Sequence, residues 1–322
     1  MGKVFITDYI SDPDIENKVL SNVASDINDP DIEVLLVWHK IIDGKYLDNF
    51  KNLKGMIRYG VGTDNIDFEE TKKRNLYLCN TPDYGIEEVS DTAIAFALNF
   101  VRGILEYDLK SKLITDGSWQ ENTIESKRRT SSLTFGVLGA GRIGSSVLLK
   151  AKAIGFNTVF YDPYKEQGYD KIVSAYRCNN LAEFLSNTDI ISINAVLTEE
   201  TKSMVDAQFI EKMKNGSYLI NTARGKIIDD LDIFIDPIKA GKILGIGLDV
   251  LPDEPPNKES ELINSWLSSE SWTAGKVIIN PHAGYYSQES YKEMRKKAAI
   301  NAKRIIDNLE PTSIIIRPQK WK

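Results

Sequence analysis

Hydrophobic and polar positions divide the first third of the chain into short apolar runs and longer amphipathic segments. Apolar runs bounded by Asp, Asn and Pro predict strands at residues 3–7, 33–38, 55–58 and 76–80. Positions that repeat with helical spacing predict helices at residues 15–23, 47–53 and 86–107. Alternation of this kind is typical of an α/β fold with a parallel sheet.

The same alternation returns after a polar segment that spans residues 108–130. Further strands are predicted at residues 133–138, 158–161, 190–193, 218–220, 245–250 and 277–279. The helices between them are predicted at residues 145–154, 181–185, 206–213 and 230–240. This half of the chain therefore predicts a six-stranded, doubly wound sheet.

With 322 residues, the chain is long enough for two domains. The pattern predicts an α/β protein made of two Rossmann-like doubly wound parallel-sheet domains with a cleft between them. An amphipathic helix at 288–309 is long enough to return to the first domain. We therefore expect a discontinuous first domain of residues 1–102 plus 288–322, and a second domain of residues 103–287.

A glycine-rich turn follows the first strand of the second domain. Gly139 allows a tight turn, Gly141 lets the backbone approach a pyrophosphate, and Gly144 lets the next helix pack closely on the strand. Arg142 and Ile143 lie in the turn just before the predicted helix, whose positive end favours phosphate. Because such turns also serve plain packing, the glycines alone do not identify a cofactor site.

Asp162 strengthens the interpretation because it closes the next predicted strand. At this spacing from the glycines, a carboxylate accepts hydrogen bonds from the ribose hydroxyls of a dinucleotide. The acid favours NAD over NADP, since a 2′-phosphate would meet like charge and no Arg immediately follows Asp162. An ordinary Asp-Pro turn is the alternative. The second domain is thus predicted to bind NAD.

Charge and composition exclude several partners. The net charge of −6 provides no basic stripe for nucleic acid, and the run 127–129 is expected to be a solvated loop. No apolar run is long enough to cross a membrane, and the chain begins directly with a strand, so we expect a cytoplasmic protein. Cys79 and Cys178 lie too far apart in sequence for a cysteine metal site or a redox pair, and no metal is expected.

Four polar residues follow the ends of consecutive strands in the second domain: Arg224, Asp249, Glu254 and His282. Ligands bind at the carboxyl ends of parallel strands, so these side chains should converge. The chain has two histidines, and His282 is the candidate proton donor, with Glu254 holding one tautomer. Arg224 could grip a carboxylate and polarise a carbonyl as hydride arrives. Each residue could alternatively have only a structural role.

These residues lie in motifs that resemble the D-isomer-specific 2-hydroxyacid dehydrogenase family. The matching segments are residues 60–67, 139–144, 221–225, 247–250, 254–255 and 281–282. The resemblance implies that Arg224, Glu254 and His282 are catalytic and that Asp249 holds the nicotinamide carboxamide. It also implies substrate contacts from the N–H groups of Val61 and Gly62.

Further cofactor contacts implied by the resemblance are Ala195, Val196, Thr222, Ala223 and Gly284.

Within the family, the chain is most similar to the branch of the C-terminal binding protein corepressors. Arg58 and His39 stand where that branch has residues beside the pocket, and Arg58 is expected to be a second carboxylate contact. Tyr285 stands in the pocket wall where the corepressors have Trp. Asn194 and Val196 also depart from the family pattern, in the loop that is expected to contact the cofactor.

The expected function is the NADH-dependent, reversible reduction of a small 2-keto acid to a D-2-hydroxy acid. Glyoxylate, hydroxypyruvate, a branched or phosphonate-bearing acid and phosphohydroxypyruvate all remain open. The alternative is an NAD-sensing, corepressor-like interaction protein, but no long polar tails flank the predicted core, which favours an enzyme. A homodimer through the NAD-binding domain is expected. Tyr161 and Lys165 have the spacing of short-chain dehydrogenases, but Tyr161 lies in a strand beside the ribose acid, which excludes that role.

Overall fold

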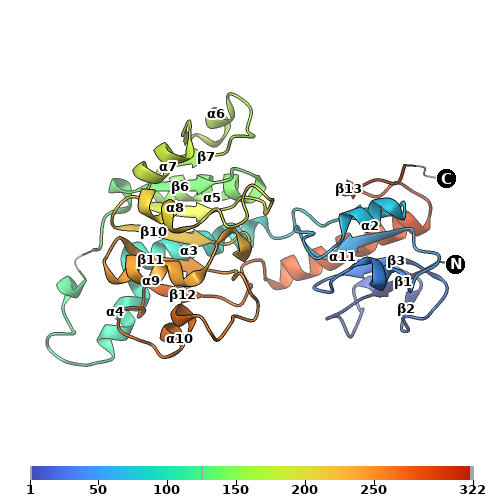
Figure 1. Cartoon of the computed structure of the whole chain (residues 1–322), viewed down its shortest axis with the longest axis horizontal. Coiled ribbons are helices and arrows are strands. Elements are labelled where there is room, and N and C mark those ends of the chain that lie inside the picture. The colour runs from blue at the N-terminus through green and yellow to red at the C-terminus, as the bar shows by residue number, and fades with distance from the viewer. Residues whose placement is uncertain (1, 125, 320–322) are drawn as a thin grey trace. The chain divides into compact units, whose positions relative to one another are not determined.

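The structure, a computed structural model, describes residues 2–124 and 126–319 and divides into two compact units (Figure 1). Unit 1 contains the described residues up to Gly85 and from Tyr286 onward, and unit 2 contains Ile86–Tyr285. Each unit is built on a parallel β-sheet with α-helices. Within the described ranges, no helix is both long enough and apolar enough to span a membrane.

Unit 1 contains a six-stranded sheet in the order β13-β5-β4-β3-β1-β2. Its strands are β1 (Lys3–Ile6), β2 (Val23–Ala24), β3 (Ile32–Val37), β4 (Gly55–Arg58), β5 (Tyr77–Cys79) and β13 (Ile314–Ile316). All neighbours pair in parallel except β13, which is antiparallel to β5. The helices are η1 (Glu16–Lys18), α1 (Gly44–Leu47), α2 (Phe68–Lys73) and α11 (Gln288–Ile306). α11 packs against β3 and β4.

Two helix predictions in unit 1 are wrong. The segment expected as a helix at 15–23 forms only the single turn η1, and Val23 then pairs with Val4 of β1. The helix expected at 47–53 is α1, which begins after Asp43 because that side chain accepts a hydrogen bond from the Tyr46 N–H. Strand pairing and capping thus override the apolar spacing. β2 and β13 were not predicted.

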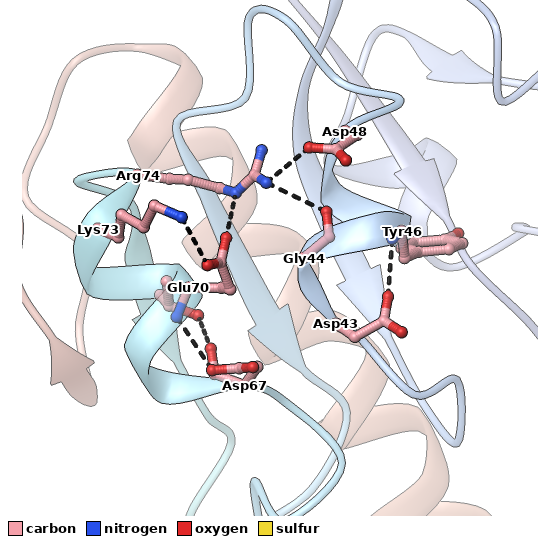
Figure 2. A network of polar contacts seen from close by, with 9 residues as sticks. Asp43, Gly44, Tyr46, Asp48, Asp67, Glu70, Lys73 and Arg74 are labelled. Atoms are coloured by element: carbon pink, nitrogen blue, oxygen red, sulfur yellow. Dashed lines mark hydrogen bonds and ion pairs between the residues drawn. The ribbon is translucent and has the colours of Figure 1, made fainter.

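A polar network joins α1 to α2 (Figure 2). Asp67 caps α2 by accepting from the Glu70 N–H at 3.0 Å. Arg74, just after α2, donates to Glu70, to the Gly44 carbonyl at 3.1 Å and to Asp48 at 2.7 Å. The network fixes the far end of the loop that runs from β4 to α2.

Unit 2 contains a seven-stranded parallel sheet in the order β12-β11-β10-β9-β6-β7-β8. Its strands are β6 (Thr134–Leu138), β7 (Asn157–Tyr161), β8 (Tyr176–Arg177), β9 (Ile190–Ile193), β10 (Ser217–Asn221), β11 (Ile243–Leu248) and β12 (Val277–Ile279). Alternate residues of its strands enter two different buried clusters: Val137 belongs to one and Leu138 to the other. This alternation follows the pleat of a sheet that is covered on both faces.

The helices of unit 2 connect these strands. The α-helices are α3 (Ile86–Arg102), α4 (Ile104–Ser111), α5 (Arg142–Ile154), α6 (Tyr169–Val173), α7 (Leu181–Asn187), α8 (Ala207–Lys212), α9 (Ile235–Lys239) and α10 (Glu261–Leu267). The short 3₁₀ turns are η2 (Glu121–Thr123), η3 (Thr130–Ser132), η4 (Gly225–Ile227) and η5 (Leu231–Phe234).

Unit 2 differs from the sequence prediction in two respects. The sheet has seven strands instead of six, because the two-residue edge strand β8 is too short to give a periodic signal. The helix expected over 86–107 is split at Gly103, which adopts a left-handed conformation with φ of 64°. α3 packs on α5 and β10 and buries Phe96 and Phe100. The first unit boundary therefore follows Gly85, whereas the sequence pattern predicts it after residue 102.

Candidate active site

The turn between β6 and α5 has the geometry of a phosphate-binding loop. Gly139 has a φ of 90°, and a Cβ on it would lie 2.7 Å from the Ala195 Cα. A Cβ on Gly144 would collide with the Gly139 carbonyl oxygen. A Cβ on Gly141, in contrast, would meet nothing within 4 Å. Two glycines are required by packing, and the third leaves open space beside the backbone.

The N-terminus of α5 faces this open turn without a side-chain cap. Gly141 is the N-cap residue of this 13-residue helix, and it makes no side-chain capping hydrogen bond. The first N–H groups of a helix lack intrahelical acceptors. The N–H groups of Arg142 and Ile143 are therefore in position to bind a phosphate.

Asp162 follows β7 and is fixed by the backbone on both sides. Its Oδ2 atom accepts from the Ala140 N–H at 2.9 Å, and its Oδ1 atom accepts from the Tyr164 N–H at 3.0 Å. Arg177, at the end of β8, donates to the Asp162 carbonyl oxygen at 3.2 Å. The sequence gives no signal for this contact, because Arg177 lies on the next strand and not immediately after Asp162.

Two buried polar atoms lack partners at neighbouring strand ends. The Thr222 Oγ1 atom, after β10, and the Asn194 Nδ2 atom, after β9, have no hydrogen-bond partner within residues 2–124 and 126–319. Buried polar groups are normally satisfied, so these atoms fit contacts to a bound polar molecule. Together with the open turn and Asp162, they fit a dinucleotide.

The other expected cofactor contacts lie in the same loops. Ala195 packs on the glycine turn, and Val196 next to it is exposed. The Ala223 N–H donates to the Asn221 Oδ1 atom at 3.0 Å. The hydroxyl of Tyr164 donates to Glu200 and so links the turn after β7 to the loop after β9.

His282 and Glu254 form a direct pair in unit 2. The Nδ1–H group of His282 donates to the Glu254 Oε2 atom at 2.7 Å, and Glu254 Oε1 accepts from the Leu251 N–H at 3.0 Å. Burial by itself raises the pKa of Glu254, but the hydrogen bond and charge of His282 outweigh it and lower that pKa below the usual value. The charge of Arg224 lowers the same pKa further.

Arg224 is held beside this pair by its own loop. The Asn221 amide donates to the Arg224 carbonyl oxygen at 2.9 Å, and the Arg224 guanidinium donates to the Ala223 carbonyl oxygen at 2.7 Å. A Cβ on Gly225 would collide with the backbone of Leu251. This close approach brings the loop after β10 against the segment that carries Glu254.

Asp249 binds the segment that carries His282. Its Oδ1 atom accepts from the N–H groups of Ala283 at 3.1 Å and Gly284 at 2.8 Å, and its carbonyl oxygen accepts from the His282 N–H at 2.8 Å. A Cβ on Gly284 would lie 2.6 Å from Asp249 Oδ2, which explains the glycine. Burial raises the pKa of the Asp249 carboxyl. The ring of Tyr285 meets that of His282 edge-on, with centroids 6.4 Å apart.

In unit 1, the loop after β4 presents free N–H groups. Gly60, with a φ of 130°, is held by Thr81, whose Oγ1 atom accepts from the Gly60 N–H at 2.6 Å. Asn80 donates to the Val61 carbonyl oxygen at 2.7 Å. Within the described part of the chain, the N–H groups of Val61 and Gly62 have no acceptor. This arrangement suits an anion.

The sequence of unit 2 matches a known family model. The model is that of the D-isomer specific 2-hydroxyacid dehydrogenase, NAD binding domain, and it matches residues 94–284. The chain belongs to this family. Membership accounts for an NAD-binding domain in this part of the chain, which contains the glycine turn, Asp162, Arg224, Glu254 and His282.

Proteins similar to this chain include a glyoxylate reductase, a C-terminal-binding protein and a D-lactate dehydrogenase. The chain is 30% identical to the glyoxylate reductase of Korarchaeum cryptofilum, over 81% of this chain and 75% of the relative. It is 29% identical to C-terminal-binding protein 1 of Caenorhabditis elegans, over 98% of this chain but 41% of that protein's length. D-lactate dehydrogenase of Aquifex aeolicus, solved with NAD and lactic acid, is 27% identical with a TM-score of 0.81, over 95% of this chain and 96% of that one.

Within the described ranges, neither a metal cluster nor an exposed cysteine adds to this site. Across the described ranges, no group of three or more His, Cys, Asp or Glu could hold a metal ion. Cys79 and Cys178 are buried, and burial raises their pKa values to about 12 and about 11. Arg58, at the end of β4, donates to the Tyr59 carbonyl oxygen, and His39, after β3, is exposed.

Proposed function

We propose that this protein catalyses the reversible reduction of a 2-keto acid to a D-2-hydroxy acid with NADH. The observation that carries the proposal is the 2.7 Å hydrogen bond between His282 and Glu254, in the same unit as the glycine turn and Asp162. A histidine held by a carboxylate is a competent proton donor at neutral pH. Family membership supplies the class of reaction.

In this mechanism, NADH supplies the hydride when it is bound. The Nδ1 atom of His282 is engaged by Glu254, so the Nε2–H group of the imidazolium donates its proton to the carbonyl oxygen of the substrate. The Arg224 guanidinium binds the substrate carboxylate and stabilises the negative charge that develops on the carbonyl oxygen. In the reverse direction, neutral His282 accepts the proton of the hydroxyl group.

Further proposed contacts to the substrate come from residues of unit 1 and of unit 2. In unit 1, the N–H groups of Val61 and Gly62 and the guanidinium of Arg58 bind the substrate carboxylate. In unit 2, Tyr285 contacts the substrate next to His282.

Unit 2 also contributes the proposed contacts to NAD. They come from Gly139, Gly141, Arg142, Ile143, Gly144, Asp162, Ala195, Val196, Thr222, Ala223, Asp249 and Gly284. We propose a preference for NADH over NADPH because Asp162 would repel a 2′-phosphate.

The experiment is an NADH-oxidation screen over a panel of 2-keto acids, with glyoxylate, pyruvate and hydroxypyruvate among them. In the His282→Gln variant, we expect turnover of the best substrate to fall ~10²-fold or more, because the general acid is lost. NADH binding, followed by nicotinamide fluorescence, should be unchanged. Near wild-type turnover in this variant would contradict the role of His282.

The likeness to C-terminal-binding protein 1 over 98% of this chain favours one second candidate, an NAD-sensing interaction protein. In that case, NADH would promote self-association, and no keto acid would be turned over at a useful rate. Turnover above about 1 s⁻¹, within the ordinary range of enzymes, would favour the dehydrogenase.

A further inference from the structure

Unit 1 carries a row of aromatic rings that runs from its core to its surface. Trp38, directly after β3, is only 5% exposed and lies at the centre of the row. Its ring centroid is 5.6 Å from that of Tyr59, 5.7 Å from Tyr291 and 5.9 Å from Tyr9. Tyr9, in the loop after β1, is 78% exposed. The row therefore ends in a large ring that faces solvent.

The buried end of the row is fixed by a charged pair. The Tyr59 hydroxyl donates to the Glu16 Oε1 atom at 2.8 Å, and the Arg295 Nε–H group donates to the same atom at 3.0 Å. Glu16 and Arg295 are both buried. Burial and the charge of Glu16 raise the pKa of Tyr59 well above its usual value, so the hydroxyl remains a donor.

The exposed end is held in place by Asp8. Its carboxylate accepts from the N–H groups of Trp38 at 3.1 Å, His39 at 2.7 Å and Lys40 at 3.0 Å. Tyr9, the next residue, has a φ of 66°, a conformation that bulky side chains rarely adopt. Strained backbone of this kind is concentrated at functional sites. The ring of Tyr9 lies 4.8 Å from that of His39.

The aromatic row is joined to the loop that presents the free N–H groups. The Asn65 side chain donates to the carbonyl oxygens of Trp38 at 3.1 Å and Lys40 at 2.8 Å. Asn65 belongs to the same loop as Val61 and Gly62. The row and this loop follow the carboxyl ends of β1, β3 and β4, which are neighbours in the sheet. An anion on the loop would thus have aromatic surface in the adjoining loops.

We propose that the aromatic row binds the side chain of the 2-keto acid and that this side chain is an aromatic ring, as in an arylpyruvate. The proposal rests on the function proposed above, with the substrate carboxylate on Val61 and Gly62. A substrate ring packs favourably against exposed rings such as those of Tyr9 and His39. Glyoxylate has no side chain to make this contact.

A phosphorylated side chain fits this surface less well. The ammonium group of Lys40, which follows His39 in the chain, lies over the ring of Tyr46 at 5.2 Å from its centroid. The carboxylate of Asp8, which accepts from the Lys40 N–H, adds negative charge to this surface. The next residue, Ile41, is exposed and apolar. These features favour an uncharged, apolar side chain.

The test compares kcat/KM for phenylpyruvate and 4-hydroxyphenylpyruvate with kcat/KM for pyruvate and glyoxylate, with NADH in excess. We expect the aromatic acids to be preferred by ~10-fold or more, the scale of a good ring contact. Tyr9→Asn should remove most of this preference, because the exposed ring that packs against the substrate ring is lost. Asn tolerates a positive φ, so the variant should fold with an unchanged melting temperature. Tyr9→Phe, which retains the ring, should keep the preference.

The outcomes separate the two proposals. Turnover of pyruvate or glyoxylate with no preference for aromatic acids would overturn the aryl assignment and leave the dehydrogenase intact. An aromatic preference that survives Tyr9→Asn unchanged would also overturn it. If the wild-type protein turned over none of the acids with NADH or NADPH, both proposals would fail.

Discussion

Asp162 shows how a single side chain serves both the fold and the proposed choice of cofactor. Its carboxylate binds the N–H groups of Ala140 and Tyr164, which fixes the turn where the ribose would lie. Arg177 reaches the carbonyl oxygen of the same residue from β8. The negative charge of Asp162 and the positive charge of Arg177 would therefore have opposite effects on a 2′-phosphate.

We expect Asp162→Ser to shift the ratio of kcat/KM for NADH over NADPH toward NADPH by ~10²-fold, the scale of one hydrogen bond to a charged group. The like-charge repulsion would be removed, and the guanidinium of Arg177 would remain. The check is steady-state kinetics with both cofactors. Adding Arg177→Met to this variant should reverse part of the gain, and an unchanged ratio in Asp162→Ser would contradict the ribose role.

Asp249 predicts a pH dependence of stability. Burial raises the pKa of its carboxyl, so the folded state holds this proton more tightly than the unfolded state does. Its contribution to stability is therefore fully present below the ordinary pKa of about 4 and is lost as the pH rises through the folded pKa. As the pH rises through the folded pKa of Asp249, the Asp249→Asn variant should become more stable relative to the wild type. Melting temperatures at about pH 4 and pH 7 would show this, and a constant difference between the two proteins would contradict it.

At the scale of elements, the turn between β6 and α5 contains one glycine that packing requires and another that leaves space for a ligand. Gly144 is required because any side chain would collide with the Gly139 carbonyl oxygen, whereas Gly141 faces open space. The three glycines look equivalent in the sequence, but a methyl group at each would have a different physical consequence.

Gly141→Ala should leave the melting temperature unchanged and raise the NADH dissociation constant by ~10-fold or more, because the methyl group would occupy the space of the phosphates. Gly144→Ala is the matched comparison and should destabilise unit 2 by about 1–3 kcal/mol through overpacking. NADH titration and thermal unfolding of both variants provide the check. Equal NADH affinity in Gly141→Ala and the wild type would argue against a phosphate at this turn.

At the scale of the molecule, unit 2 exposes apolar side chains on α4 and the segment after it. They are Ile104, Leu109, Leu113, Ile114 and Trp119. Exposed apolar patches of this kind mark association surfaces in many proteins. This surface supports the proposal of a homodimer through the NAD-binding unit.

We expect the wild-type protein to be a dimer at micromolar concentration and the double variant Leu113→Asp, Ile114→Asp to be a monomer. Two charges in an apolar contact should raise the dimer dissociation constant by ~10²-fold or more. Light scattering after size-exclusion chromatography measures both species. Ile172→Asp is the control, because Ile172 is equally exposed on α6 but lies outside this surface. A monomeric wild type would refute the homodimer.

The sequence by itself determined the α/β class, the family and the order of the site residues along the chain. Glycine turns, strand-end acids and apolar runs follow local rules: a short segment sets the φ angles, the spacing and the periodicity. The same rules failed at 15–23 and 47–53, where strand pairing and an Asp cap decide the conformation. They also placed the first domain boundary at residue 102, because a helix does not reveal in its sequence which sheet it packs on.

Only the tertiary structure decided which distant residues meet. It brings Arg177 to Asp162, Glu16 to Arg295 and Tyr9 to Trp38, all from separate elements. Such contacts depend on strand order and on the packing of whole elements, which leave no periodic signal in a single sequence. The proposed chemistry of His282 was therefore visible in the motifs, whereas the aromatic row that favours an aryl substrate emerged only from the fold.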